Sequence, residues 1–163
     1  MKSKFSGWAY FVAFYASLFT LIFLFCILSD IVFNSVVPVY FYFIITFFVV
    51  FVWTWSVFGE MRKKVVAIEI GYNSIAVKRY LGLGRPQVFY FEQVDGYKLS
   101  VLASSSTLYE YLYLMQGDKK IVKLSEYYHK NYKELKDLLI DAKFKDLGFE
   151  EYSGLRELKE IFV

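Results

Sequence analysis

The first third of the chain consists of two long apolar runs separated by a short polar stretch. No charged side chain occurs in residues 7–28, and a second uncharged run covers residues 31–58. Each run is long enough to cross a hydrocarbon layer of about 30 Å as an α-helix. Asp30 lies between the runs, where a turn would keep its carboxylate outside the apolar layer. The pattern predicts a transmembrane helical hairpin in residues 1–64, with spans at about 7–28 and 36–58.

Positive charges flank only the outer ends of this predicted hairpin. Lys2 and Lys4 precede the first span, and Arg62, Lys63 and Lys64 follow the second, whereas the turn contains no Lys or Arg. Positive residues near the ends of spans stay on the cytoplasmic side of a membrane. The sequence therefore predicts a multi-pass protein of the cell inner membrane with both termini in the cytoplasm. The three basic residues after the second span are expected to form a juxtamembrane segment beside the lipid headgroups.

Beyond residue 64 the pattern changes to short alternating segments separated by turn residues. Alternation of apolar and polar positions predicts strands. We expect six of them, near residues 66–70, 75–80, 87–92, 97–101, 107–116 and 119–125. The fifth predicted strand divides its side chains most clearly, with leucines on one face and tyrosines on the other: Leu108, Leu112 and Leu114; Tyr109, Tyr111 and Tyr113. We expect the leucines, with Glu110 as an exception on their face, to point into a core and the tyrosines to form a half-exposed face.

A helical period follows the predicted strands. Asn131 is a suitable N-cap, and Glu134 three residues later completes a capping-box pattern. Apolar residues then recur on one stripe, at Tyr132, Leu135, Leu138, Leu139 and Ala142. This helix is expected to end near Gly148, and a short second helix is expected from about Gly154. The domain organisation predicted is therefore a hairpin in 1–64, a β-rich unit with its helix in 65–148, and a helical tail in 149–163.

The region from Lys64 to about Gly148 resembles the bacterial pleckstrin-homology-like domains. The resemblance lies in the strand segments IEIGYNSIAV, VFYFEQVDGYKL and LYEYLYLMQGDKKIVKL, followed by the helix NYKELKDLL. Many proteins of that family carry the domain directly after a two-helix anchor. The resemblance implies a membrane-anchored α+β fold, with a small antiparallel β-barrel or sandwich capped by a C-terminal helix. The family has seven strands before the helix, so either residues 96–106 bend into two strands or the fold is a relative.

Composition and charge narrow the function classes. The chain is 57% hydrophobic and 22% aromatic, which the predicted hairpin explains. Residues 1–64 contain five Lys or Arg and two acids, whereas residues 65–163 contain fourteen of each. The β-rich unit therefore has no net basic field for nucleic acid. The single cysteine, Cys26, lies inside the first predicted span and excludes a disulfide within the chain or a cysteine-based zinc site.

No residue pattern predicts catalysis, a metal site or a cofactor. His129 is the single histidine, and we interpret it as a loop or cap residue, because a triad or a metal site needs further partners. The segment with Gly82 and Gly84 lacks the third glycine of a nucleotide-binding fingerprint and is interpreted as a hairpin tip. Within it, Leu83 and Arg85 are candidates for contact with the membrane surface or a partner.

The sequence thus predicts a non-enzymatic membrane protein whose cytoplasmic domain binds a protein or peptide. The predicted interaction surface is Tyr109, Tyr111 and Tyr113, because tyrosine is favoured at interfaces. The lipid bilayer and an unidentified protein are the expected partners, and self-association through the spans stays open. The alternative is a ligand-gated effector, in which the β-rich unit senses a small molecule and the hairpin oligomerises to disrupt the membrane.

Overall fold

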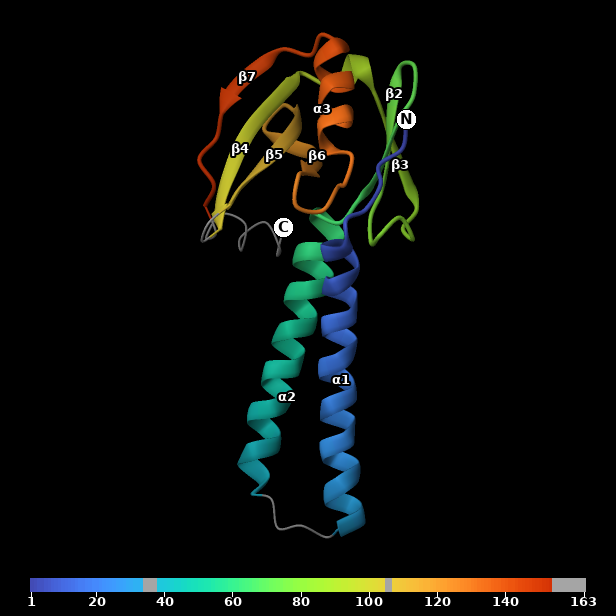
Figure 1. Ribbon diagram of the computed structural model, residues 1–163. Helices are drawn as coiled ribbons and strands as arrows, with labels where there is room; N and C mark the ends of the chain where they lie inside the picture. The colour runs from blue at the N-terminus through green and yellow to red at the C-terminus, as the bar shows by residue number, and fades with distance from the viewer. Residues whose placement is uncertain (34–37, 105–106, 154–163) are drawn as a thin grey trace.

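The protein consists of a stalk of two antiparallel helices and a head of two β-sheets and one helix (Figure 1). The computed structural model describes residues 1–33, 38–104 and 107–153. The stalk contains helix α1 (Gly7–Phe33), helix α2 (Val39–Thr54) and a π-helical turn η1 (Trp55–Met61) that continues α2. The head lies at the end of the stalk where α1 begins and η1 ends, and we call this side of the head its stalk end.

The two predicted apolar helices are confirmed. Segments Gly7–Ser29 and Val39–Met61, each of 23 residues, are long and apolar enough to cross a membrane. Only 6% and 11% of their most apolar windows are buried inside the protein, so most of their side chains face outward. A helix in the core of a water-soluble protein would instead bury this apolar surface. The predicted start at Gly7 is confirmed, and α1 continues beyond the predicted end to Phe33.

Small side chains and one polar contact join the stalk helices. Ala16 is buried at 2% exposure, and Ala9, at 0%, packs with Val65 and Tyr128 at the junction with the head. The indole Nε1 of Trp53 on α2 donates a hydrogen bond of 2.6 Å to Thr20 Oγ1 on α1. Ser17, in contrast, bonds within its own helix. Of these two hydroxyl side chains, Thr20 therefore makes the contact between the helices.

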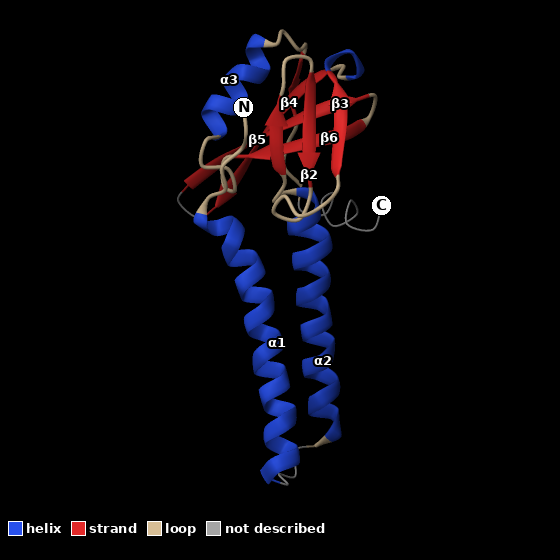
Figure 2. Cartoon of the chain, turned by 90° about the vertical axis from the view of Figure 1, so that its right-hand side faces the viewer, coloured by secondary structure: helices blue, strands red, loops and turns tan. Residues whose placement is uncertain are grey.

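The head contains a three-stranded and a four-stranded sheet, packed around one core that helix α3 (Tyr132–Asp141) covers from one side (Figures 1 and 2). The first sheet has the order β1-β2-β3 and the second the order β6-β5-β4-β7. The strands are β1 (Ala67–Ile70), β2 (Ser74–Lys78), β3 (Pro86–Tyr90), β4 (Gly96–Ser104), β5 (Thr107–Gln116), β6 (Lys119–Ser125) and β7 (Asp146–Phe149), with a short 3₁₀ turn η2 (Phe91–Gln93) before β4. The predicted α+β class and the six predicted strands are confirmed. A closed barrel is not formed among the described residues, because the two sheets are not hydrogen-bonded to each other.

The seventh strand lies after the helix and not before it. α3 ends at Asp141 and Lys143 has a left-handed φ of 60°, so the predicted helix to Gly148 is wrong in its second half. The chain then returns as β7 and pairs in parallel with β4. β4 itself runs unbroken through Gly96–Ser104, so it is not bent into two strands. The predicted tail helix from Gly154 lies outside the described residues.

The core confirms most of the predicted inward faces. Leu112, Leu114, Leu135 and Leu139 are all 0% exposed. Leu108 was expected beside them but is 67% exposed, because it lies near the end of the β4–β5 hairpin, beyond the residues that α3 covers. Glu110, the polar exception on this face, accepts hydrogen bonds from Tyr132 Oη (2.5 Å) and Lys136 Nζ (2.6 Å). These contacts with α3 satisfy the carboxylate at the edge of the core.

The segment before α1 is part of the head, which the sequence pattern did not predict. Lys2 forms a β-bridge with Glu69 of β1, and Phe5 forms one with His129. Asn131 precedes α3 as expected, but its side chain makes no capping hydrogen bond. Its Oδ1 accepts from the Lys4 backbone N (2.7 Å) and its Nδ2 donates to the Lys2 carbonyl (3.0 Å). The chain is therefore part of the head both before α1 begins and after η1 ends.

Candidate functional site

A pocket lined mainly by basic side chains lies at the stalk end of the head. Its volume is about 500 Å³, within the range of small-molecule sites. Apolar side chains of Val66, Val77, Ile121 and Val122 form part of its wall. The charged residues that line it come from three segments: Arg62 and Lys63; Arg79; and Asp118, Lys119, Lys120 and Lys123. We call this cavity, with six cations and one carboxylate, the basic pocket.

A β-bulge places the lysines of β6. Leu114 pairs with Val122 and Met115 pairs with Lys120, so Ile121 is an extra residue in β6. As a result Lys120 and Lys123 both lie over the ring of Tyr113, with their Nζ atoms 4.3 Å and 5.2 Å from its centroid. Cation–π contact with the ring steadies these long side chains at the edge of the sheet.

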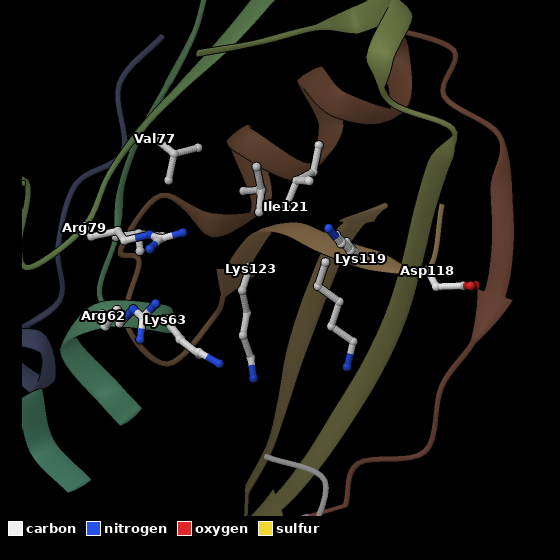
Figure 3. A pocket seen from close by; sticks show the side chains of 11 residues that line it. Arg62, Lys63, Val77, Arg79, Asp118, Lys119, Ile121 and Lys123 are labelled. Atoms are coloured by element: carbon white, nitrogen blue, oxygen red, sulfur yellow. The ribbon is translucent and has the colours of Figure 1, made fainter. Parts of the chain in front are cut away.

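The loop between β2 and β3 places Arg79. Tyr80, Leu81 and Gly82 have φ values of 54°, 56° and 85°, a left-handed run that non-glycine residues rarely adopt. Two hydrogen bonds from this loop offset the strain, from Tyr80 N to Met61 O and from Leu81 N to Val65 O, both 3.0 Å. The loop is therefore fastened to the end of η1. In Figure 3, Arg79 points into the same space as Arg62.

The structure separates the three basic residues after the second helix. Arg62 and Lys63 line the basic pocket, and Lys63 and Lys123 extend toward the same side of it in Figure 3. Lys64 is 7% exposed, and its Nζ lies 2.8 Å from Glu60 Oε1. The other oxygen of Glu60 accepts a 2.6 Å hydrogen bond from Tyr128 Oη. Burial, and then the nearby Glu60 carboxylate, raise the pKa of Tyr128 well above its ordinary value, so this phenol stays protonated and donates.

Positive charge in the basic pocket is only partly balanced by the described residues. Asp118 is the one acidic residue among those that line it. No carboxylate of residues 1–33, 38–104 or 107–153 forms an ion pair with Arg62, Arg79 or Lys119. Guanidinium and ammonium groups that converge in this way bind carboxylates or phosphates through charge-assisted hydrogen bonds.

The predicted tyrosine surface needs correction. Tyr111 and Tyr113 are only 1% and 2% exposed, so the expected half-exposed face is wrong at both positions. Leu147 of β7 packs beside them, and the ring of Tyr152 stacks on Tyr111 with centroids 6.2 Å apart. Tyr109 is partly exposed and contacts Tyr127 edge-to-face at 4.9 Å. Partner binding at these tyrosines stays a prediction that their burial does not favour.

The predicted loop contacts, Leu83 and Arg85, lie in the β2–β3 connection but not in the basic pocket. Leu83 is 87% exposed, and the Arg85 side chain is also exposed. The loop carries Arg79 into the pocket and leaves Leu83 uncovered by described residues. The structure therefore places Leu83 and Arg85 on the outer surface of the head.

His129 is a buried structural residue. It is 1% exposed, with Nε2 2.8 Å from the Val66 carbonyl and Nδ1 2.9 Å from the Ser125 carbonyl. Burial lowers its pKa below the ordinary 6.5, although both backbone contacts favour the charged form. Its ring nitrogens therefore serve the packing of the head. Among the described residues no group of three or more His, Cys, Asp or Glu has a geometry that could hold a metal ion.

Three lysines of the pocket were missed by the sequence interpretation: Lys119, Lys120 and Lys123. The three lysines in the segment KKIVK could have indicated a basic site. In a regular strand, however, Lys120 and Lys123 would point to opposite faces. The similarity to pleckstrin-homology-like domains stays a prediction. Searches of the chain against protein-family models, curated proteins and solved structures find no match.

Proposed function

We propose that this protein is a non-enzymatic, membrane-anchored module that binds an anionic group at the inner face of the cell membrane. In this proposal α1 and α2 span the inner membrane, and the head and both termini lie in the cytoplasm. Two helices long and apolar enough to span support the anchor. Lys2, Lys4, Arg62 and Lys63 at one end of the hairpin, with no Lys or Arg in residues 29–38 at the other, support the orientation.

The observation that carries the proposal is that six cationic side chains line the basic pocket at the stalk end, of which Arg62, Arg79 and Lys119 form no ion pair with a carboxylate of the described residues. Arg62 follows Met61, the last residue of η1, so a membrane around the stalk would bring its headgroups to this level. Each basic residue near an anionic membrane surface adds about 1 kcal/mol of attraction. The guanidinium groups of Arg62 and Arg79 each present paired N–H donors of the kind that bind phosphate. The ligand we propose is the phosphate-bearing headgroup of an anionic lipid.

The test measures which anionic molecules the full-length protein retains. The protein is reconstituted in nanodiscs that contain phosphatidylcholine and phosphatidylglycerol, extracted mildly and weighed by native mass spectrometry with its bound lipid. The test variant combines Arg79→Gln and Lys119→Gln, whose side chains have no ion pair with described residues. Loss of two charge-assisted contacts should reduce retained phosphatidylglycerol by roughly tenfold or more. A matched control, Lys130→Gln with Lys133→Gln, removes two exposed lysines outside the pocket and should retain lipid normally.

Two further arms distinguish the source of the anion. Glycerol phosphate in solution should compete only weakly with phosphatidylglycerol, because the lipid is presented at the pocket by the membrane. An acidic peptide such as polyglutamate represents the protein partner that the sequence alone predicted. If the peptide binds and the lipid is retained equally by wild type and the pocket variant, the headgroup proposal is wrong and a protein partner replaces it.

One observation favours the ligand-gated effector as a second candidate. Arg62 and Lys63 contact the pocket and directly follow η1, so a ligand held there would act on the end of the second helix. Vesicles loaded with a dye and reconstituted with the protein should leak on addition of an anionic ligand if this candidate is right. If the vesicles stay intact while the ligand is bound, the effector candidate is wrong and the binding-module proposal is kept.

A further inference from the structure

Two projecting parts of the head lie on either side of the stalk, at its stalk end. In Figure 1 the β2–β3 loop descends on one side and the β4–β5 hairpin on the other, both toward the helices. Each carries an exposed leucine near its end, Leu83 at 87% and Leu108 at 67% exposure. Single exposed leucines are common on protein surfaces, so what distinguishes this pair is its place on two projections that point toward the apolar helices.

Contacts fix both projections beside the helix ends. The β2–β3 loop donates from Tyr80 N to Met61 O, at the last residue of η1. On the other side Tyr109, next to Leu108, contacts Tyr127, and Tyr127 stacks on Trp8 in the first turn of α1 with centroids 5.4 Å apart. Trp8 is 51% exposed, at the position where tryptophan occupies the boundary between lipid and water.

We propose that the head docks onto the bilayer surface through these two projections, with Leu83 and Leu108 inserted at the lipid interface. The occupant of this surface is the bilayer, because the two projections that carry the leucines point toward the apolar helices at the stalk end (Figure 1). Arg85, which is exposed, lies two residues after Leu83 in the sequence, which suits contact with anionic headgroups while the leucine enters the apolar layer. The inference rests on the proposed membrane-spanning hairpin but not on a ligand in the basic pocket.

Docking at both sides of the stalk would hold the head upright on the membrane. A head attached only through the helix ends can tilt, whereas contacts on opposite sides of the stalk resist tilting. The basic pocket lies between the stalk and β6, so docking would also keep it open toward the headgroups. The surface therefore has a mechanical role distinct from ligand capture.

The test places an environment-sensitive fluorophore at single cysteines in full-length protein reconstituted in nanodiscs. Cys26→Ala removes the one native cysteine, and Leu83→Cys, Leu108→Cys and Tyr72→Cys provide three labelling sites. Tyr72 is the matched control: it is fully exposed, at 102%, in the turn between β1 and β2 at the opposite end of the head. Each variant is first checked for an unchanged melting temperature.

Lipids that carry a quencher should abolish much of the emission at positions 83 and 108 and leave position 72 unchanged, whereas aqueous iodide should quench mainly position 72. If positions 83 and 108 are as accessible to iodide as position 72, the docking proposal is overturned. Protection from both quenchers would mean that a second copy of the chain covers the leucines, which also overturns it. If the protein can be extracted without detergent, the proposal that the hairpin spans the membrane is wrong. This extraction test does not depend on the fluorophores, so it separates failure of the proposed function from failure of the docking proposal.

Discussion

Gly96 is the residue whose replacement tests the packing of β7 most directly. A Cβ at this position would lie 2.2 Å from the Lys145 carbonyl oxygen and 2.8 Å from Leu147 Cγ. In Gly96→Ala the β7 segment must move away by about 1 Å to reach ordinary contact distance. That movement breaks the hydrogen bond from Tyr97 N to Lys145 O, now 2.9 Å, and strains the one from Glu150 N to Leu99 O, now 2.8 Å.

The expected cost follows from these contacts. Two backbone hydrogen bonds contribute about 1 kcal/mol each, and crowding of a close-packed site adds about 1 kcal/mol or more. Gly96→Ala should therefore destabilise the head by roughly 2–4 kcal/mol. For a unit of this size the melting temperature should fall by about 10–20 °C.

The assay is thermal unfolding of the full-length protein in detergent, followed by near-ultraviolet circular dichroism of the tyrosine-rich head. Hydrogen exchange at residues 146–150 reports on β7 itself and should become faster in the variant. Gly71→Ala is the matched control, because its Cβ would meet only Ser74 oxygens at 3.4 Å, an ordinary contact. Equal melting temperatures and equal exchange in wild type and Gly96→Ala would mean that β7 does not pair closely with β4.

Two further predictions concern the junction between head and stalk and the buried histidine. Tyr128→Phe removes the hydrogen bond to Glu60 and should destabilise the head by about 1–2 kcal/mol, whereas Tyr72→Phe, on a fully exposed residue, should leave the melting temperature unchanged. Because burial lowers the pKa of His129 below 6.5 in the folded head, the unfolded chain binds more protons once the pH falls below that value. The free energy of unfolding should therefore lose nothing through His129 above about pH 6.5, and below that pH it should fall by up to about 1.4 kcal/mol per pH unit. The variant His129→Gln should not show this slope between about pH 7 and pH 5. Melting curves across that range test the histidine, and an unchanged slope in the variant would contradict its role.

The parts of the fold that follow from local patterns were predictable from the sequence. Two uncharged apolar runs allow only helices in lipid, and period-two alternation in segments such as Thr107–Gln116 identifies strands whose bounds agree with the structure. The leucine face of β5 was predictable in its middle, at Leu112 and Leu114, where both sheets contribute neighbours. The prediction was wrong at Leu108 because alternation indicates which face of the strand a side chain is on, but not where the core ends.

The parts that depend on long-range pairing were not predictable. Asp95 and Gly96 have the composition of a turn, yet Gly96 begins β4 because its missing side chain admits β7 from fifty residues later in the chain. Asn131 has the composition of a helix cap, but the backbone of Lys2 and Lys4 occupies its amide. The basic pocket was missed for the same reason, since its cations come from three separate segments and a bulge at Ile121 changes the faces of two lysines in β6.

The pairing of the first residues with the head has a consequence for the order of assembly during synthesis. The bond between Lys4 N and Asn131 Oδ1 joins residues separated by 127 positions, and both apolar helices lie between them. Residues 1–3 find their partners in β1, but Lys4, Phe5 and Ser6 find theirs, between residues 127 and 131, only after residue 131 has been made. We therefore expect membrane insertion of the hairpin to precede completion of the head. A nascent chain arrested before that point should leave its N-terminal segment open to protease, and one arrested well after it should not.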